Sequence, residues 1–269
     1  MLVIGEKINA SNRSVGEAIS RRDAEFVAGL AQAQAAAGAD FIDLNAGVGH
    51  NGRKEEIAAM KWLVETVEQA TDKPLAIDSD STEVIMAALA SYHGDQVIIN
   101  SVSAEPNRLK SIGSLAAEHG AWLVALAMGE SGIPTTAEER LAACELIMTR
   151  LEKLGIKSEQ VLFDPLVLPI AVDNTQGLIT LKTIEQIKAR FPGARTVAGL
   201  SNISYGLPER KLVNRSFLLM AAYAGLDAVI SDPLDPKAMG LVKVADMLTG
   251  EDPLCRRYVR AHRQGKIAD

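Results

Sequence analysis

The stretch from Thr196 to Ser204 reads Thr-Val-Ala-Gly-Leu-Ser-Asn-Ile-Ser, and its pattern decides the fold class. A short apolar run stops at Gly199, and small polar side chains, among them Ser201 and Asn202, follow it. This is the pattern of a parallel strand that releases its chain into a loop, and such loops carry chemistry in α/β proteins. Because Asn and Ser also form ordinary turns, a strand end closed by a simple turn is the competing interpretation.

The same pattern recurs along the chain. Short runs rich in Val, Ile and Leu alternate with longer segments of helical spacing, for example Lys54–Gln69, in which Ile57, Met60, Val64 and Val67 line one face. The predicted strands are Leu2–Gly5, Phe41–Asn45, Pro74–Asp78, Gln96–Asn100, Ala121–Leu126, Gln160–Asp164, Thr196–Gly199 and Asp227–Ser231. Eight such units predict an α/β protein, a single (β/α)8 TIM barrel over residues 1–269; a doubly wound open sheet is the alternative.

Composition limits the classes of partner. Hydrophobic residues make up 48% of the 269 residues but aromatic residues only 4%, which disfavours a base-stacking surface for single-stranded nucleic acid. The net charge of −6 gives no general attraction to nucleic acid or to an anionic membrane. Two distant cysteines, Cys144 and Cys255, and the lack of a signal segment or long apolar run predict a cytoplasmic protein.

Polar side chains gather at the ends of the predicted strands. They are Glu6 and Asn9 after the first strand, Asp43 and Asn45, Asp78 and Ser79, Asn100 and Ser101, Asp164, Ser201 and Asn202, and Ser231 and Asp232. In a parallel barrel all strands end on one face, so these residues are expected around one pocket. No Lys, Cys or His occupies these predicted ends, which leaves no obvious amine or thiolate nucleophile and no imidazole base. We predict no bound metal.

The predicted pocket is rich in hydrogen-bond acceptors. Asp78 and Asp164 are acceptors when ionised, whereas Asn100 and Asn202 both donate and accept. A carboxylate can accept two parallel N–H bonds from an amino group and its neighbouring ring nitrogen. The set therefore suits a flat heterocycle with an amidine-like edge; a pterin has one, and purines and other rings also satisfy it.

Several motifs together resemble one family. They are Gly5-Glu6-Lys7-Ile8-Asn9, Asp43-Leu44-Asn45, Ile77-Asp78-Ser79, Ile99-Asn100-Ser101, Asp164-Pro165-Leu166 with Leu168-Pro169, Gly199-Leu200-Ser201-Asn202 and Asn214-Arg215. In this order, over about residues 1 to 250, the chain resembles the methyltetrahydrofolate:corrinoid protein methyltransferases of the pterin-binding, dihydropteroate synthase-like superfamily. The resemblance implies a (β/α)8 barrel, a homodimer, and transfer of the N5 methyl group of methyltetrahydrofolate to the cobalt(I) of a corrinoid, a cobalamin, carried by a separate protein.

The resemblance also assigns roles to residues. Asp78, Asn100 and Asp164 match positions that hold the pterin, with Asp164 the partner of its amino-pyrimidinone edge. Asn202 matches the asparagine that hydrogen-bonds N5 and is the predicted catalytic residue. The supporting side chains around the substrate are predicted to be Asp43, Asn45 and Ser201.

Two other functions stay open at this point. A dihydropteroate synthase-like enzyme is disfavoured because that family carries a Lys at the end of strand 7 and an Arg-x-His near strand 8, where this chain has Gly199-Leu200-Ser201-Asn202 and Ser231-Asp232-Pro233. A non-catalytic folate-binding scaffold is the second alternative. The partner that the resemblance implies is a corrinoid/iron–sulfur protein or a small corrinoid protein. The neighbouring reading frames would tell which of the two pathways applies.

Overall fold

The computed structural model describes residues 1–47, 52–130 and 132–267, and its strands form a closed barrel. Every neighbouring pair of strands is parallel, and β8 closes the ring by pairing with β1. The strands are β1 (Leu2–Asn9), β2 (Phe41–Asn45), β3 (Leu75–Asp78), β4 (Val97–Val102), β5 (Trp122–Leu126), β6 (Val161–Asp164), β7 (Arg195–Gly199) and β8 (Ala228–Ser231). The predicted (β/α)8 barrel is therefore confirmed.

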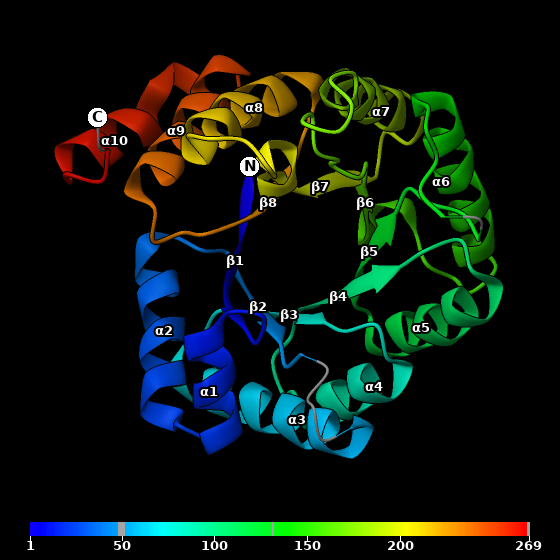
Figure 1. Ribbon diagram of the computed structural model, residues 1–269, viewed down its shortest axis with the longest axis vertical. Coiled ribbons are helices and arrows are strands. Elements are labelled where there is room, and N and C mark those ends of the chain that lie inside the picture. Colours follow the sequence, from blue (N-terminus) through cyan, green and yellow to red (C-terminus); the bar gives the residue numbers. More distant parts are fainter. Residues whose placement is uncertain (48–51, 131, 268–269) are drawn as a thin grey trace.

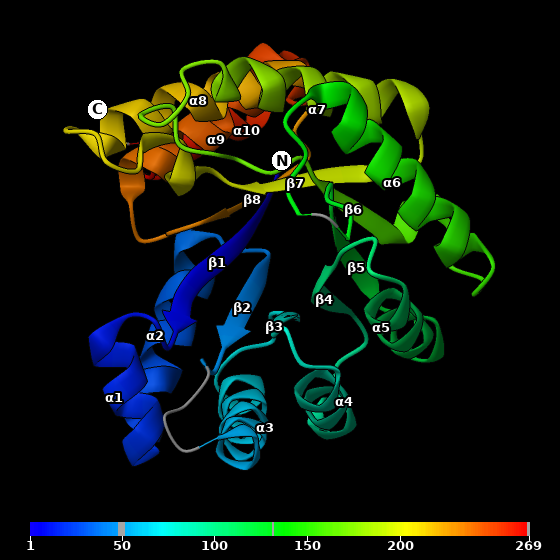
Figure 2. The same cartoon turned by 45° about the vertical axis from the view of Figure 1, so that its right-hand side comes forward.

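Helices surround the ring of strands on the outside (Figure 1), and the turned view shows the same arrangement (Figure 2). The α-helices are α1 (Arg13–Arg21), α2 (Ala24–Ala37), α3 (Arg53–Ala70), α4 (Thr82–Ser91), α5 (Pro106–His119), α6 (Ala137–Glu152), α7 (Gln176–Arg190), α8 (Arg210–Ala224), α9 (Pro236–Leu248) and α10 (Arg256–Arg263). Short 3-10 helices are η1 (Ser158–Gln160), η2 (Leu200–Ser204) and η3 (Pro253–Cys255). Within the described residues, no helix is both long and apolar enough to cross a membrane.

The helices begin where the sequence supplies caps. The carboxylate of Asp23 accepts a hydrogen bond from the Phe26 amide, which satisfies one free N–H group at the start of α2. Thr136 and Glu139 form a reciprocal capping box at the start of α6. On the predicted inner face of α3, Met60, Val64 and Val67 are fully buried against the barrel. The helical spacing of the sequence thus predicted the packed faces correctly.

Two strands continue further at their carboxyl ends than predicted. β1 continues from Gly5 to Asn9, and β4 continues from Asn100 to Val102. In both cases polar residues interrupt the apolar run, but the backbone goes on pairing after an irregularity in register. One consequence is that Lys7 lies inside β1, near the carboxyl end of the strand, instead of in the loop after it.

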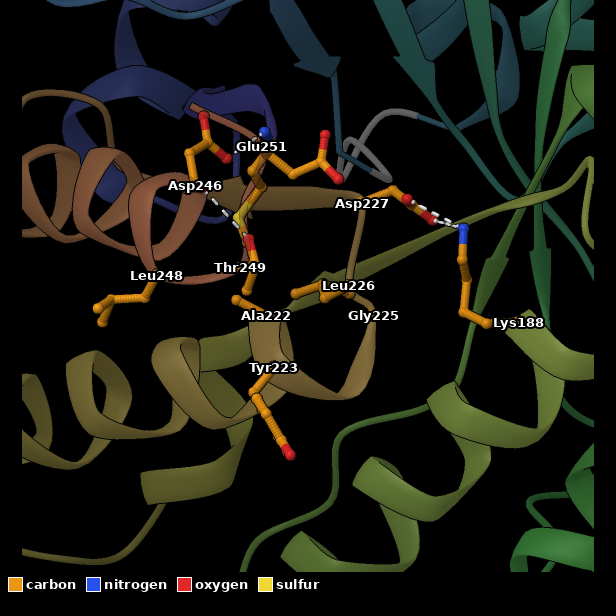
Figure 3. A pocket seen from close by; sticks show the side chains of 11 residues that line it. Lys188, Ala222, Tyr223, Gly225, Leu226, Asp227, Asp246, Leu248, Thr249 and Glu251 are labelled. Atoms are coloured by element: carbon orange, nitrogen blue, oxygen red, sulfur yellow. Dashed lines mark hydrogen bonds and ion pairs between the residues drawn. The ribbon is translucent and has the colours of Figure 1, made fainter. Parts of the chain in front are cut away.

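The amino ends of the strands are held by ion pairs around a cavity of about 500 Å³. Lys188 of α7 and Asp227, which directly precedes β8, point toward each other with their N and O atoms 2.8 Å apart (Figure 3). Asp227 also accepts a hydrogen bond of 2.8 Å from the Thr196 amide of β7. On the other side, the Met1 amino nitrogen donates to Asp246 at 2.6 Å. This end of the barrel therefore joins α7, α9 and three strands.

We expect Asp227→Asn to lower the free energy of unfolding by about 1–3 kcal/mol, the usual effect of leaving a donor in a half-buried site without its acceptor. The asparagine would keep one acceptor oxygen and turn an N–H group toward Lys188 or Thr196. Urea unfolding of both proteins measures the change. The control is Glu251→Gln in the same cavity, whose carboxylate has no hydrogen-bond partner among the described residues and whose loss should change stability by less than about 0.5 kcal/mol. Equal stability of Asp227→Asn and the parent would contradict the assignment.

Candidate active site

The interior of the barrel is apolar along the middle of the strands and polar at their carboxyl ends. An inner layer of side chains fills the barrel: Ile4, Phe41, Ala76, Ile98, Val124, Leu162, Val197 and Ala228. Because side chains alternate across a strand, the residue two positions further along points inward again. Those residues include Glu6, Asp43, Asp78, Asn100 and Asp164. Alternation thus stacks a polar layer on the apolar one at the carboxyl ends of the strands.

Two amides tie four of the predicted residues together. The Asn45 amide on β2 donates to a carboxylate oxygen of Asp78 on β3 at 2.8 Å. The Asn100 amide on β4 donates to Asp43 on β2 at 3.4 Å, which is near the long limit for a hydrogen bond. The structure therefore brings Asp43, Asn45, Asp78 and Asn100 together, as the barrel topology predicted.

Burial makes this group of carboxyls hard to ionise. Asp43 is only 2% exposed, and burial followed by the negative charge of Asp78 raises its pKa well above the ordinary value. Burial also raises the pKa of Asp78, although the hydrogen bond from Asn45 opposes this. Carboxyls that share a site of this kind tend to hold a proton between them. N–H donors of a ligand would be favourable partners for these carboxyls, because they stabilise the ionised, acceptor-only form.

Asp164 stands on β6, opposite β2 in the ring of strands. One of its carboxylate oxygens accepts a hydrogen bond of 2.8 Å from the Leu166 amide. Burial raises the pKa of Asp164 to about 6, while the Leu166 amide and the positive charge of Arg140 act in the opposite direction. Titratable groups whose pKa values are shifted toward neutral pH are concentrated at functional sites.

Ser201 and Asn202 lie in η2, which follows β7 directly, and both side chains are exposed at the rim. Arg210 holds this turn, because its guanidinium donates to the Ser201 carbonyl at 2.8 Å and to the Ser204 hydroxyl at 3.1 Å. Asn202 is thus presented on a fixed turn at the rim. Within the described residues, neither the Ser201 nor the Asn202 side chain hydrogen-bonds to the carboxyls on the other strands.

The inner wall is open at Gly199, the last residue of β7. A side chain there would point inward like that of Val197, and a Cβ atom placed on Gly199 would meet no atom within 4 Å. The glycine therefore borders open space beside η2 instead of filling it. This opening gives a ligand room next to Asn202.

Glu6 and Asp232 were expected at the mouth of the barrel, but they were given no role among the predicted substrate-binding or catalytic residues. Burial and then the negative charge of Asp232 raise the pKa of Glu6 to about 7, and Lys7 opposes the shift. The Lys7 ammonium binds Asp232 at 3.0 Å. Glu6, Ser201 and Asp232 line a cavity of about 190 Å³ beside β8. The spacing of Leu2, Ile4 and Glu6 indicates that Glu6 lies on the inner face of β1. The strand was predicted to end at Gly5, because the apolar run ends there.

The chain belongs to the pterin binding enzymes, because the sequence profile of that family matches residues 5–232. It is 35% identical over 271 residues to a methylcorrinoid:tetrahydrofolate methyltransferase of Eubacterium limosum, covering 99% of this chain and 98% of that protein. It is also 33% identical over 243 residues to a methionine synthase of Mycobacterium tuberculosis, where the match covers 86% of this chain and only 20% of that protein. The family resemblance seen in the motifs is confirmed.

Solved structures agree in fold. The 7,8-dihydropteroate synthase from Vibrio fischeri ES114 superposes with a TM-score of 0.67, over 94% of each chain, at 18% sequence identity. Identity this low supports a shared barrel and says nothing of a shared reaction. Among the described residues, no group of three or more His, Cys, Asp and Glu side chains has the arrangement of a metal site.

We expect Glu6→Gln to stabilise the protein at alkaline pH. A carboxyl whose folded-state pKa is raised to about 7 destabilises the fold as pH rises from about 4.3, the ordinary pKa of Glu, through 7. The neutral variant escapes this loss, so it should be more stable than the parent by roughly 1–2 kcal/mol above pH 8, after discounting for solvent screening, and equally stable near pH 4. Urea unfolding across pH 4–9 measures the difference. A parallel pH curve for the two proteins would contradict the assignment. Glu118→Gln, at an exposed residue near the end of α5, is the control.

Proposed function

We propose that this protein transfers a methyl group between N5 of tetrahydrofolate and the cobalt of a corrinoid, a cobalamin, carried by a separate corrinoid protein. The observation that carries the proposal is the 35% identity to the E. limosum methyltransferase over 99% of the chain. The name of that relative gives transfer from a methylcorrinoid to tetrahydrofolate. Since a catalyst stabilises the same transition state in both directions, the proposal covers methyltetrahydrofolate as donor as well.

The polar layer suits a pterin ring. Asp164 is proposed to accept two N–H bonds from the amino-pyrimidinone edge, and Asp78 and Asn100 to bind the same ring from β3 and β4. Asn45 and Asp43 support them through the hydrogen bonds at 2.8 Å to Asp78 and 3.4 Å from Asn100. Buried carboxyls with raised pKa values lack strong donors in the free protein, so N–H groups of a ligand would supply what the site needs.

Asn202 is proposed to act on N5 from the rim, with Ser201 beside it. An amine nitrogen leaves more easily when a donated hydrogen bond stabilises its developing electron pair, and a donor fixed in place needs no reorganisation during the reaction. Arg210 fixes η2 through the Ser201 carbonyl and the Ser204 hydroxyl, so the amide is pre-positioned. The corrinoid supplies the nucleophilic cobalt, and the exposed rim leaves access for the protein that carries it.

The alternative functions make different demands on the site. A dihydropteroate synthase-like enzyme would form a bond to an arylamine, and the Lys expected at the end of β7 for that family is replaced by Gly199 and η2. A non-catalytic scaffold would bind methyltetrahydrofolate without transferring its methyl group. Mixing the protein with methyltetrahydrofolate and cobalt(I) cobalamin, and following the corrinoid spectrum, separates these functions from methyl transfer.

We expect Asn202→Ala to slow single-turnover methyl transfer about a hundredfold, comparable to removing one fixed oxyanion donor, or about 3 kcal/mol. Folate binding should weaken less, because the other hydrogen bonds to the ring remain. Stopped-flow mixing at saturating methyltetrahydrofolate measures the rate, and the melting temperature of the variant reports whether it is folded.

The matched control is Asn107→Ala, an exposed asparagine near the start of α5, which should transfer the methyl group at the parent rate. A folded Asn202→Ala variant whose rate stays within about threefold of the parent, a difference of only ~0.7 kcal/mol, would remove Asn202 from the catalytic role.

The proposal includes a homodimer in the cytoplasm. Apolar side chains are exposed along the outer face of α7 and α8, including Tyr223 at 86% and Leu178 and Leu212 at 66% each. Leu181, Leu219, Met220 and Tyr223 line a groove between the two helices. Monomers rarely expose apolar patches of more than a few hundred Å². A second copy of the chain is the proposed occupant, because a self-complementary contact on this outer wall leaves the rim free for the corrinoid protein.

We expect the parent to sediment at twice its chain mass of 28.7 kDa and Tyr223→Asp to sediment as a monomer, since a buried unpaired carboxylate opposes association. Leu254→Asp, at an exposed apolar residue of η3 outside this patch, is the control and should stay dimeric. A dimeric Tyr223→Asp variant at micromolar concentration, or a monomeric parent, would contradict this interface.

A further inference from the structure

Arg140, in the first turn of α6, is the largest side chain in the described residues that is fully buried, at 0% exposure. A buried guanidinium must use its N–H groups in hydrogen bonds to offset the loss of water. Because no catalytic role explains it, its contacts show what it does in the fold.

The guanidinium binds the loop after β6. Nη1 donates to the carbonyls of Pro165 at 2.9 Å and Leu166 at 2.8 Å. Nε donates to the carbonyl of Pro134 at 3.2 Å, and Nη2 donates to the side-chain oxygen of Gln176 at 3.0 Å. These four bonds occupy four of the five N–H groups of the fork. Arg140 thereby joins α6, the β6 loop and the start of α7.

This loop carries the hydrogen bond to Asp164. Pro165 and Leu166 directly follow Asp164, and the Leu166 amide donates to its carboxylate at 2.8 Å. Leu166 has a φ of +66°, in the left-handed region that is unfavourable for a side chain such as leucine. The carbonyl of the same residue is held by Arg140 and by the Thr180 hydroxyl, at 2.8 and 3.0 Å. The hydrogen bonds to the Leu166 carbonyl thus orient the Leu166 amide toward the carboxylate of Asp164.

The charge of Arg140 also acts on Asp164. Burial raises the pKa of Asp164, and the Leu166 amide and Arg140 lower it, with a result of about 6. The other titratable group that interacts with Asp164 in the described part of the chain is the Cys144 thiol of α6, whose own pKa is raised by burial, so that it is neutral at physiological pH. Glu6, Asp43 and Asp78, at the same mouth, do not contribute to the shift of Asp164.

We propose that Arg140 is a positioning residue for Asp164: it holds the Pro165 and Leu166 carbonyls so that the Leu166 amide stays on the carboxylate, and its charge keeps that carboxylate an acceptor at neutral pH. The consequence for folate binding rests on the function proposed above. The effect on Asp164 itself does not, so the two are tested separately.

The first experiment uses the ligand-free protein labelled with ¹³C at aspartate carboxyls, with Asp164→Asn to assign the signal. In Arg140→Met the Asp164 midpoint should rise from about 6 by about one pH unit, at the lower end of the effect of losing a neighbouring opposite charge. Arg140→Lys keeps the charge and should shift the midpoint less, but should increase hydrogen exchange of the Leu166 amide about tenfold. A folded Arg140→Met variant with an unchanged midpoint overturns the proposal.

The matched control lies on the same helix. Arg150 also donates to a backbone carbonyl, that of Ala104 at 2.6 Å, but in the segment that follows β4. Arg150→Met should leave the Asp164 midpoint and the Leu166 amide exchange unchanged. If Arg140→Met does not fold, Gln176→Leu removes the acceptor of Nη2, together with the 2.8 Å hydrogen bond from the Gln176 amide to Asp173, and leaves the other contacts of Arg140 in place. It should raise the Leu166 amide exchange in the same direction as Arg140→Lys. Unchanged exchange in both of these variants overturns the proposal.

The second experiment measures binding of methyltetrahydrofolate by calorimetry from pH 5.5 to 8.5. Because an ionised Asp164 is the better acceptor, affinity of the parent should rise with pH through about 6 and then level off. In Arg140→Met the rise should move to higher pH by the amount seen in the carboxyl titration. A parent that does not bind methyltetrahydrofolate, with a shifted carboxyl midpoint in Arg140→Met, would overturn the proposed function and leave the positioning role intact. Normal binding of methyltetrahydrofolate by the parent, with an unshifted Asp164 midpoint in Arg140→Met, would overturn the positioning role and leave the proposed function intact.

Discussion

Every second side chain of a barrel strand must point into the barrel, and the rest of this structure depends on that constraint. The interior is filled by buried apolar residues such as Ile98 and Leu162, which offer no hydrogen-bond partner to a polar group at that level. Two residues later the same strands carry Asn100 and Asp164. Because all eight strands are parallel, these side chains meet at one end of the barrel, and the topology alone collects them.

Collecting carboxyls in this way has an electrostatic price. Burial raises the pKa of Glu6, Asp43, Asp78 and Asp164. Their closest partners are mostly amides and backbone N–H groups; the Lys7 ammonium binds Asp232 instead. A site built from such acceptors is destabilising when empty, which is the usual balance between stability and function at a binding site. It gains most from a ligand whose edge carries N–H donors.

Much of this could be predicted from residues alone. The eight apolar runs predicted the barrel. Strand-end residues such as Asp43 and Asn100 were correctly expected to meet, because all strands of a parallel barrel end on the same face. The predicted length of β1 was wrong. The polar residues Glu6 and Lys7 break the apolar run, but the backbone of β1 continues to pair with β2 beyond them. The role of Arg140 could not be predicted, because a guanidinium that binds carbonyls of another loop leaves no pattern in sequence spacing. The roles of Asp164 and Asn202 toward a substrate stay predictions.

The two ends of the barrel are built on different principles. At the amino ends, oppositely charged groups such as Lys188 and Asp227 are paired at 2.8 Å, whereas Asp43 and Asp78 at the carboxyl ends accept hydrogen bonds from neutral amides. Effects of substitutions at well-separated sites that share no partners add up nearly independently. Sequence changes at the mouth can therefore accumulate without weakening the ion pairs at the base, and extra stability gained at the base can offset a destabilising change at the mouth. Such a division makes the scaffold evolvable: new substrate preferences can arise on a barrel whose folding is secured at the opposite end.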